Sequence, residues 1–303
     1  MLTLLAPGQG SQTPGMLTEW LELPGATERV QKWSDSVGLD LLRLGTTATA
    51  EEITDTSVTQ PLVVAGALLS YAALSARYGQ LPADTLVAGH SVGELAAAAI
   101  AGVISDDDAV ALAGIRGAHM AKACALVPTG MAAVLGGDEA AVLERIDEFE
   151  LIPANRNAVG QIVAAGAIEG IDKLVDNAPE KARIRKLAVA GAFHTHFMAP
   201  AREAVESAAA RITPQNPTLT LLSNKDGKPV ASGDDALAKL VSQVTSPVRW
   251  DLCSAAMREA GVDAVIELAP AGALAGIAKR ELKGVPQRAV KAPADLADLP
   301  GLG

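Results

Sequence analysis

The sequence predicts an α/β protein in which a large domain with a parallel sheet is interrupted by a small α+β insert. Short apolar segments alternate with segments of helical pattern in the first and last parts of the chain, as parallel sheets require. A strand, a Gly-x-Ser-x-Gly turn and an alanine-rich helix follow one another at residues 86–103. From about residue 127 to residue 190 the pattern becomes strand, helix, strand, helix, strand, which predicts the insert.

The elements before the insert follow from local patterns. Residues 1–6 form an apolar strand that ends in the glycine-rich loop 7–12. Ser57 and Gln60 stand in the positions of a capping box and predict a helix over residues 57–73. Ser105 is followed by three aspartates and begins a long helix to about residue 124, because acidic side chains favour a helix N-terminus.

The insert and the C-terminal part are described by the same patterns. In the insert, strands are expected at 131–135, 161–165 and 182–190, with helices at 138–148 and 168–178. Beyond residue 191, strands and helices alternate again, with segments at 218–224, 235–244, 250–260, 264–268 and 274–282. The tail 292–303 is rich in proline, alanine and aspartate, and we expect it to fray.

Composition excludes several classes of function. The longest apolar run, residues 95–104, is too short to span a bilayer, and no secretory leader is recognisable, so we expect a cytoplasmic protein without a membrane partner. Cys124 and Cys253 are the only cysteines; their wide separation fits a reducing compartment and predicts no metal site. A net charge of −10 argues against nucleic acid as a partner.

The turn around Ser91 carries the clearest chemical signal. Gly89 and Gly93 flank the serine, and a sharp turn between a strand and a helix needs small neighbours. Free backbone amides and the positive end of the helix dipole favour an oxyanion beside Ser91. The pattern therefore predicts acyl transfer through a serine ester.

A serine nucleophile needs a base, and the chain offers four histidines, namely His90, His119, His194 and His196. His90 adjoins Ser91, but neighbours in a tight turn point apart, which favours a structural role. His119 lies in the middle of a predicted helix. His194 and His196 follow a predicted strand, and strand ends supply α/β active sites. We prefer His194 as the base, with His196 as the alternative.

Arg116 is the only formally charged side chain among residues 109–121. Gly114 and Gly117 lie close to it and leave room for another group to approach. A guanidinium pairs with a carboxylate through two parallel hydrogen bonds. We therefore predict that Arg116 binds a substrate carboxylate; an exposed helical arginine is the alternative.

Seven sequence blocks, in order along nearly the whole chain, resemble the malonyl-CoA:acyl carrier protein transacylase family. They are GQGSQ at 8–12, QP at 60–61, GHSVGE at 89–94, RG at 116–117, NAVGQ at 157–161, FHT at 193–195 and SPVRW at 246–250. The chain is most similar to the stand-alone bacterial enzymes of type II fatty-acid and polyketide synthesis. The resemblance implies a large α/β-hydrolase-like domain, residues 1–126 and 191–303, and a small ferredoxin-like α+β subdomain, residues 127–190.

The resemblance also implies roles for individual residues. Ser91 would be the nucleophile and His194 its base, oriented by a backbone carbonyl from residues 246–249 rather than by an aspartate. The backbone amides of Gln9 and Val92 would form the oxyanion hole. Arg116 would hold the malonyl carboxylate, and the other substrate-binding residues would be Gln60, His90, Asn157, Gln161 and Phe193.

Simpler explanations exist for several of these residues. Gln60 could only cap its helix, and Asn157 and Gln161 could form a polar loop. Phe193 resembles the bulky residue of malonyl-selective members of the wider acyltransferase family, but it could equally be a core residue.

The implied reaction moves a malonyl group from malonyl-CoA to the phosphopantetheine thiol of an acidic acyl carrier protein. No cofactor is implied, because coenzyme A enters as part of the substrate, and we expect a monomer. Two basic groups are candidates for docking the carrier protein, although either could be a solvated face: Lys181, Arg183 and Arg185, or Lys279, Arg280 and Lys283.

Two departures from the family pattern and two rival functions remain. The chain has ELAP at 267–270 where Glu-x-Gly-Pro is usual, and Val159 where proline is frequent. An α/β-hydrolase shares the serine turn, but its histidine lies near the C-terminus, whereas none follows His196 here. A non-catalytic module that docks carrier proteins would be expected to lack Ser91, His194 or Arg116, and all three are present.

Overall fold

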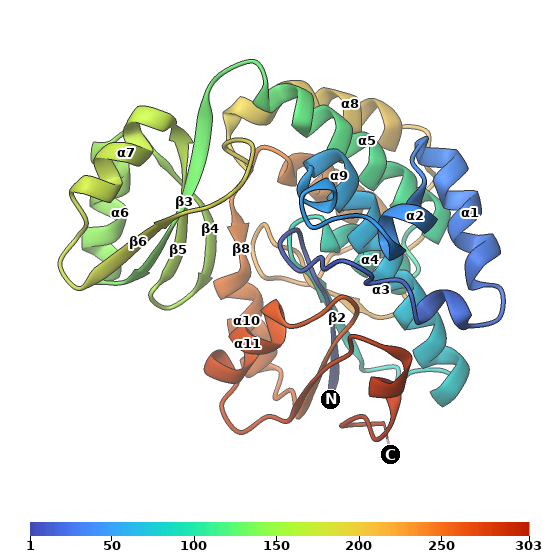
Figure 1. The fold of residues 1–303 in the computed structure, drawn as a ribbon. Coiled ribbons are helices and arrows are strands. Elements are labelled where there is room, and N and C mark those ends of the chain that lie inside the picture. The colour runs from blue at the N-terminus through green and yellow to red at the C-terminus, as the bar shows by residue number, and fades with distance from the viewer. Residues whose placement is uncertain (303) are drawn as a thin grey trace.

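A parallel sheet forms the centre of the larger part of the molecule (Figure 1), in a computed structural model that describes residues 1–302. Its strand order is β10–β9–β1–β2–β7, and each neighbouring pair runs parallel. The strands are β1 (Leu2–Ala6), β2 (Leu86–Gly89), β7 (Thr220–Leu221), β9 (Ala264–Glu267) and β10 (Gln287–Ala289). The three middle strands are buried along their whole length, as parallel strands covered on both faces must be.

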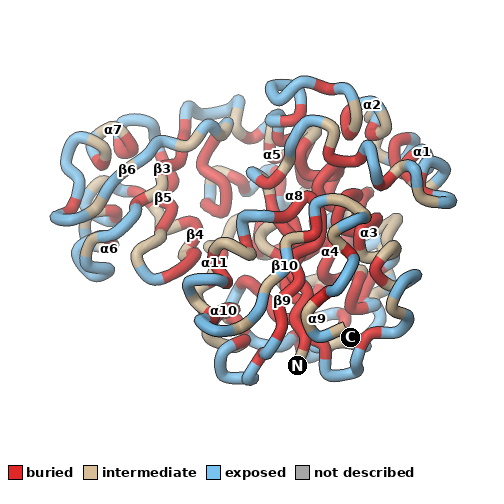
Figure 2. The backbone as a smooth tube through the Cα atoms, turned by 60° about the horizontal axis from the view of Figure 1, so that its bottom comes forward, coloured by how far each residue is buried: buried red, intermediate tan, exposed pale blue. Residues whose placement is uncertain are grey.

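Helices surround this sheet and complete the main core, and the buried part of the chain is concentrated there (Figure 2). The helices are α1 (Ala26–Val37), α2 (Leu41–Thr46), α3 (Thr56–Tyr78), α4 (Gly93–Ile100), α5 (Asp106–Cys124), α8 (Ala199–Ala209), α9 (Gly233–Gln243), α10 (Trp250–Glu259) and α11 (Ala273–Glu281), with 3-10 turns η1 (Trp20–Glu22), η2 (Glu52–Thr54), η3 (His196–Met198) and η4 (Pro293–Leu296). By length and composition α3 alone among the described helices could cross a membrane, but 72% of its apolar window is buried inside the fold.

A second sheet forms the smaller part of the molecule, seen beside the first in Figure 1. Its strand order is β6–β3–β5–β4–β8, and it is covered by α6 (Glu139–Glu148) and α7 (Ile168–Asp176). Its strands are β3 (Thr129–Gly136), β4 (Ile152–Ala158), β5 (Gln161–Ala167), β6 (Ala182–Lys186) and β8 (Val248–Arg249). The strand β8 comes from the C-terminal part of the chain and pairs in parallel with β4, so it joins the small sheet to the larger part.

Two local predictions about α3 and the tail are wrong. Asp55, not Ser57, caps α3, because its side chain accepts a hydrogen bond from the Ser57 amide at 2.8 Å. The capping box therefore does not form. The tail does not fray over its described residues 292–302: Leu296 and Leu299 are each 4% exposed, and the Tyr78 hydroxyl donates to the Leu296 carbonyl at 2.7 Å.

The strand boundaries also differ from the sequence prediction. The strand expected at 182–190 ends at Lys186, and the strand expected at 218–224 shortens to Thr220–Leu221. The strand β4 was not predicted, because its sequence IPANRNA lacks a clear apolar alternation. The helices α1, α2 and α8 were also not predicted.

The register of the parallel sheet positions the candidate site. Ala6 at the end of β1 lies beside Gly89 at the end of β2, and the His90 amide donates to the Ala6 carbonyl at 3.0 Å. The loop after β1 and the serine turn after β2 therefore meet at the carboxyl edge of the sheet, where α/β proteins place their active sites.

Candidate active site

The serine turn has the tight geometry that the sequence predicts. Ser91 has a backbone φ of 55°, a left-handed conformation that non-glycine residues rarely adopt outside functional sites. A Cβ at Gly89 would lie 2.1 Å from the Gly93 carbonyl, and a Cβ at Gly93 would lie 2.3 Å from the Ala6 carbonyl oxygen. The predicted need for glycine on both sides of Ser91 is confirmed.

Asn224 holds this turn in place, and sequence reasoning missed it. Its Oδ1 accepts a hydrogen bond from the Ser91 amide at 2.8 Å, and its Nδ2 donates to the Gly89 carbonyl at 2.7 Å. The side chain is fully buried. The only available signal was its place just after β7, the strand next to β2 in the sheet.

His194 lies against the serine in the geometry of a nucleophile and its base. Its Nε2 is 2.7 Å from Ser91 Oγ, and its Nδ1 donates to the Gln243 carbonyl at 2.9 Å. With the Nδ1 proton committed to that carbonyl, Nε2 carries the lone pair that accepts the serine proton. The alternative His196 is exposed and stacks on Phe197.

The group that orients His194 is a backbone carbonyl, as expected. Ser246, within the predicted residues 246–249, makes a weaker backbone contact with His194, but the main acceptor, at 2.9 Å, lies outside that range. It belongs to Gln243, the last residue of α9, and the carbonyls of a final helical turn are free to accept other donors. The same carbonyl also accepts the Ser246 amide at 3.2 Å.

Burial, and secondarily the positive charge of Arg116, lowers the pKa of His194 from 6.5 to about 3. The imidazole is therefore neutral at neutral pH. This is the protonation state that a general base needs before it takes a proton.

Arg116 is buried beside the nucleophile, with 3% of its side chain exposed, so the alternative of an exposed helical arginine is wrong. It donates to Gln60 Oε1 at 2.6 Å, to Gln243 Oε1 at 2.9 Å and to Ser91 Oγ at 3.3 Å. Burial lowers the pKa of Arg116 to about 10, which leaves the guanidinium charged at neutral pH. A Cβ at Gly117 would lie 2.7 Å from the Thr56 carbonyl, so this glycine lets α5 approach α3 and brings Gln60 to Arg116.

A buried carboxylate, Glu94, lies in the first turn of α4, three residues after Ser91. It accepts hydrogen bonds from the Asn224 amide at 2.7 Å and from Gln243 Nε2, and Gln243 Nε2 also donates to the Ser91 carbonyl at 2.9 Å. Burial raises the pKa of Glu94 to about 7 in spite of these donors. Sequence reasoning gave no role to Glu94 or to the Gln243 side chain.

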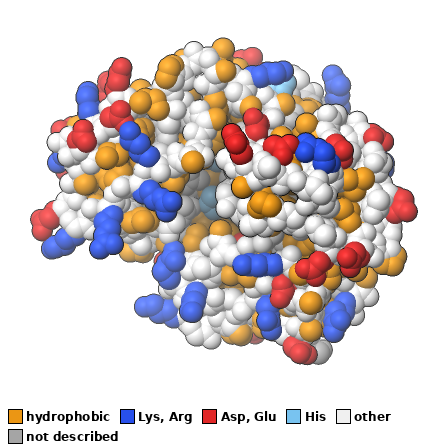
Figure 3. All heavy atoms as spheres, in the orientation of Figure 1, with side chains coloured by type: hydrophobic (Ala, Val, Ile, Leu, Met, Phe, Trp, Pro, Cys, Tyr) orange, Lys and Arg blue, Asp and Glu red, His pale blue; other side chains and the backbone are white. Residues whose placement is uncertain are grey.

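Ser91, His194 and Arg116 open onto a cleft of about 180 Å³, between the two sheets. Figure 3 shows a hollow there, with Lys and Arg side chains along its left and lower rim. The predicted binding residues that line the cleft, together with Ser91, His194 and Arg116, are Gln9, Gln60, His90, Asn157 and Phe193. His90 Nε2 lies 2.8 Å from Asn157 Oδ1, so this pair bridges the larger part and the small sheet.

Gln161 does not line the cleft. Its Oε1 accepts a hydrogen bond from Arg280 Nη2 at 2.7 Å, where the start of β5 meets α11.

The loop after β1 packs directly on the serine turn: a Cβ at Gly8 would lie 2.5 Å from the His90 carbonyl oxygen. This close approach brings the Gln9 amide to the same edge of the sheet as the Val92 amide. Within residues 1–302 neither amide is used in a hydrogen bond, so both are available to a ligand.

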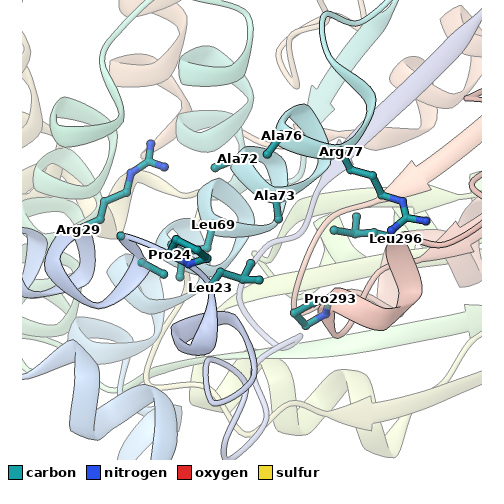
Figure 4. A pocket seen from close by; sticks show the side chains of 12 residues that line it. Leu23, Pro24, Arg29, Leu69, Ala72, Ala73, Ala76, Arg77, Pro293 and Leu296 are labelled. Atoms are coloured by element: carbon teal, nitrogen blue, oxygen red, sulfur yellow. The ribbon is translucent and has the colours of Figure 1, made fainter.

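A wider hollow of about 560 Å³ lies elsewhere, between α3, residues 23–29 and η4 (Figure 4). Leucine, alanine and proline side chains line it, with Arg29 and Arg77 on opposite sides, and it contains no nucleophile or general base. The chemistry therefore belongs to the smaller cleft. Among residues 1–302, no group of three or more His, Cys, Asp or Glu side chains is placed to hold a metal ion.

Comparisons with known proteins agree with this geometry. The family model described as "Acyl transferase domain" matches residues 3–296. The malonyl CoA-acyl carrier protein transacylase of Mycobacterium tuberculosis strain H37Rv is 62% identical over 302 residues, 100% of both chains.

Solved structures give the same result for the fold. The crystal structure of MCAT from Mycobacterium tuberculosis superimposes with a TM-score of 0.95 at 62% identity, over 98% of each chain. A malonyl-transacylase solved in complex with a type II PKS acyl-carrier protein superimposes with a TM-score of 0.91 at 30% identity, over 97% of each chain. These matches confirm the predicted α/β fold class. The chain belongs to the acyl transferase family, and within it to the malonyl CoA-acyl carrier protein transacylases.

Proposed function

We propose that this protein transfers the malonyl group of malonyl-CoA to the phosphopantetheine thiol of an acyl carrier protein, through a malonyl ester on Ser91. The observation that carries the proposal is the buried, charged Arg116, which lies 3.3 Å from Ser91 Oγ. A cation fixed beside the nucleophile suits an acyl group that ends in a carboxylate. The identity with transacylases supports the same substrates.

In the first half-reaction, Ser91 Oγ attacks the thioester carbonyl while its proton passes to His194 Nε2. The carbonyl oxygen becomes an oxyanion that the backbone amides of Gln9 and Val92 stabilise. The carbon–sulfur bond then breaks, and the departing sulfur takes the proton from His194 and leaves as the coenzyme A thiol.

In the second half-reaction, the carrier thiol gives its proton to His194 Nε2, and its sulfur attacks the malonyl-serine carbonyl. The Ser91 oxygen leaves and recovers the proton from His194. No bound cofactor takes part, because both acyl bonds are exchanged between protein and thiol alone.

Arg116 acts in both half-reactions by holding the distal carboxylate of the malonyl group. Its donors are directed to Gln60, Gln243 and Ser91. A bound malonyl group fills the cleft of about 180 Å³, and this favours the thiol over water as the second nucleophile.

The carrier protein docks on the basic group at the end of α11, formed by Lys279 and Arg280 in the helix and Lys283 just after it. All three side chains are exposed, and Arg280 contacts Gln161 beside the β4–β5 turn. That turn follows Asn157, which lines the cleft. In the other basic group, Arg183 and Arg185 lie on β6 and Lys181 lies just before it. This strand is at the edge of the small sheet farthest from β4 and β8, so the group is the weaker candidate.

The setting of the reaction is the cytoplasm, where the thiols of Cys124 and Cys253 stay reduced. The protein acts as a monomer. It supplies malonyl units for fatty-acid synthesis, and its likeness to the partner of a type II PKS carrier supports a polyketide use as a second role.

Intact and peptide mass after brief incubation with malonyl-CoA, without a carrier protein, tests the proposal. We expect a malonyl adduct on the Ser91 peptide that holo-carrier protein discharges, and no adduct on Ser91→Ala. Discharge to free malonate regardless of the carrier would identify a hydrolase. No adduct and no turnover would favour a non-catalytic docking module.

A further inference from the structure

The side-chain amide of Gln243 lies between two buried charged groups, Arg116 and Glu94. The two half-reactions above use Arg116 but give no role to Glu94 or to this amide. Its Oε1 accepts a hydrogen bond from Arg116 Nη2 at 2.9 Å, and its Nε2 donates to Glu94 Oε2. An amide presents one acceptor side and one donor side. Only this orientation satisfies both the guanidinium and the carboxylate.

The carboxylate end of this chain of contacts is itself fixed. Glu94 Oε1 accepts the Asn224 amide at 2.7 Å, and only 5% of Glu94 is exposed. Gln243 Nε2 also donates to the Ser91 carbonyl at 2.9 Å, so three contacts determine where the amide lies. Arg116 lines the cleft, whereas neither Glu94 nor Gln243 is among its lining residues.

We infer that Glu94 is a positioning residue, which fixes the side-chain amide of Gln243 and through it aims Arg116 at the carboxylate of the acyl group. The inference rests on the proposed role of Arg116 in binding malonyl. Glu94 touches no reacting atom, and its effect on the reaction passes through Gln243.

Charge balance gives a physical reason for a carboxylate at this position. A buried guanidinium without a counter-charge is costly, and the negative charge of Glu94 stabilises the charged form of Arg116. The charged and titratable groups that face Glu94 are Arg116 on α5, Lys239 on α9 and Cys253 on α10.

Protonation of Glu94 is expected to weaken the arrangement. Both neighbours, the Asn224 amide and Gln243 Nε2, are donors, so a protonated carboxyl group must give up one of them. Burial raises the pKa of Glu94 to about 7, so this change falls near neutral pH.

The first test compares Ser91 acylation by malonyl-CoA and acetyl-CoA in Glu94→Gln. We expect kcat/KM for malonyl to fall about tenfold or more relative to acetyl, because a bond to a charged group is being misaligned. The matched control is Glu267→Gln, which makes the same change at a fully buried glutamate that accepts three backbone amides after β9. It is expected to keep the native malonyl-to-acetyl ratio. An equal loss for both acyl groups in Glu94→Gln would overturn the inference.

Arg116→Ala separates this inference from the proposed function. If Arg116→Ala selectively lowers kcat/KM for malonyl-CoA and Glu94→Gln does not, only the role of Glu94 is wrong. If Arg116→Ala lowers both acyl groups equally, the carboxylate-binding role of Arg116 is wrong, and the positioning role falls with it. We expect the malonyl-to-acetyl ratio of the double variant to be no lower than that of Arg116→Ala alone, because the two residues act on one contact.

A second variant keeps the test decisive if Glu94→Gln does not fold. Gln243→Met keeps the main-chain carbonyl that orients His194 but removes the three side-chain contacts to Arg116, Glu94 and the Ser91 carbonyl. We expect the same selective loss of kcat/KM for malonyl-CoA. In the native enzyme the malonyl-to-acetyl ratio should fall as the pH drops through about 7, and in Gln243→Met it should stay flat. A ratio independent of pH in the native enzyme would contradict the inference.

Discussion

At the scale of single residues, the nucleophile and its base both have strained backbones. Ser91 has a φ of 55° and His194 a φ of 61°, and such conformations cost about 1–3 kcal/mol each. Buried hydrogen bonds hold both residues: the Ser91 amide donates to Asn224 Oδ1, and His194 Nδ1 donates to the Gln243 carbonyl. Part of the energy of folding is thus used to fix the distance between Oγ and Nε2.

The lowered pKa of His194 predicts the pH dependence of its role as a base. A base with a pKa of about 3 stays unprotonated well below the ordinary value of 6.5. We therefore expect Ser91 acetylation by acetyl-CoA to change little between about pH 5 and about pH 8. Rates from quenched peptide mass would show this, and a loss of rate with a midpoint near the ordinary histidine pKa would contradict it.

The same pKa shift bears on stability. Because the pKa of His194 is lower in the folded than in the unfolded state, its contribution is present above 6.5 and is lost as the pH falls toward about 3. Glu94 acts in the opposite sense: its pKa is raised from 4.5 to about 7, so its contribution is lost as the pH rises through that range.

The side chain of Phe193 is expected to set the selectivity between malonyl and methylmalonyl groups. Its ring lines the cleft beside His194 and is 7% exposed. One methyl group in such a pocket is usually discriminated by about 1–3 kcal/mol. Phe193→Ser should therefore raise the rate with methylmalonyl-CoA relative to malonyl-CoA, measured as competing adducts on Ser91. An unchanged ratio would place the determinant on another residue.

At the scale of secondary-structure elements, strand ends and helix ends build the site. The carboxyl ends of β1, β2 and β7 bring together the Gln9 loop, the serine turn and Asn224, while the end of α9 supplies the carbonyl for His194. Each element contributes one or two groups, so the site depends on their relative placement.

Asn224→Ala tests how strongly β7 holds the serine turn. Removing both hydrogen bonds leaves the Ser91 amide and the Gly89 carbonyl without partners. We expect a loss of about 2 kcal/mol or more in the free energy of unfolding and slower Ser91 acylation. Asn216→Ala is the control, because its side chain accepts one backbone amide at an exposed position. Equal effects of the two variants would contradict a specific role for Asn224.

Charge reversal on two elements tests where the carrier protein docks. We expect Lys279→Glu with Lys283→Glu to raise KM for the carrier about tenfold at low salt, because local charge steers association. Arg183→Glu with Arg185→Glu on β6 should leave KM nearly unchanged. The opposite result would move the docking site to the small sheet, and equal effects would indicate only the overall charge.

Sequence patterns predicted the serine turn, the choice of His194 and the approach to Arg116, because these depend on local spacing and on glycines. They did not predict Asn224, Glu94 or the Gln243 side chain. These groups converge from the loop after β7, from α4 and from the end of α9, and each is an ordinary polar residue in its own segment. Polar residues of this kind can be identified as parts of the site only when the register of the sheet is known.

At the scale of the whole molecule, the C-terminal tail packs against the end of α3. Tyr78 reaches the tail, and Leu296 and Leu299 are buried against the main core. The tail is therefore a structural part of the larger domain, although its composition suggests a loose end.

Leu296→Ala tests this packing. We expect it to lower the free energy of unfolding by about 2–4 kcal/mol, because a buried leucine is replaced and a cavity remains. Val159→Ser is the control, since Val159 is 84% exposed and should change little. Urea denaturation measures both, and a Leu296→Ala protein as stable as the control would mean that the tail does not support the core.

The pairing of β8 with β4 has a mechanical consequence. Only residues 244–247 separate β8 from Gln243, whose carbonyl orients His194. If the small sheet swung outward to admit a long thioester, it would pull on this short tether and draw the carbonyl away from the imidazole. Opening the cleft would thus separate His194 from the carbonyl that orients it, and closing the cleft would restore this contact in the same movement.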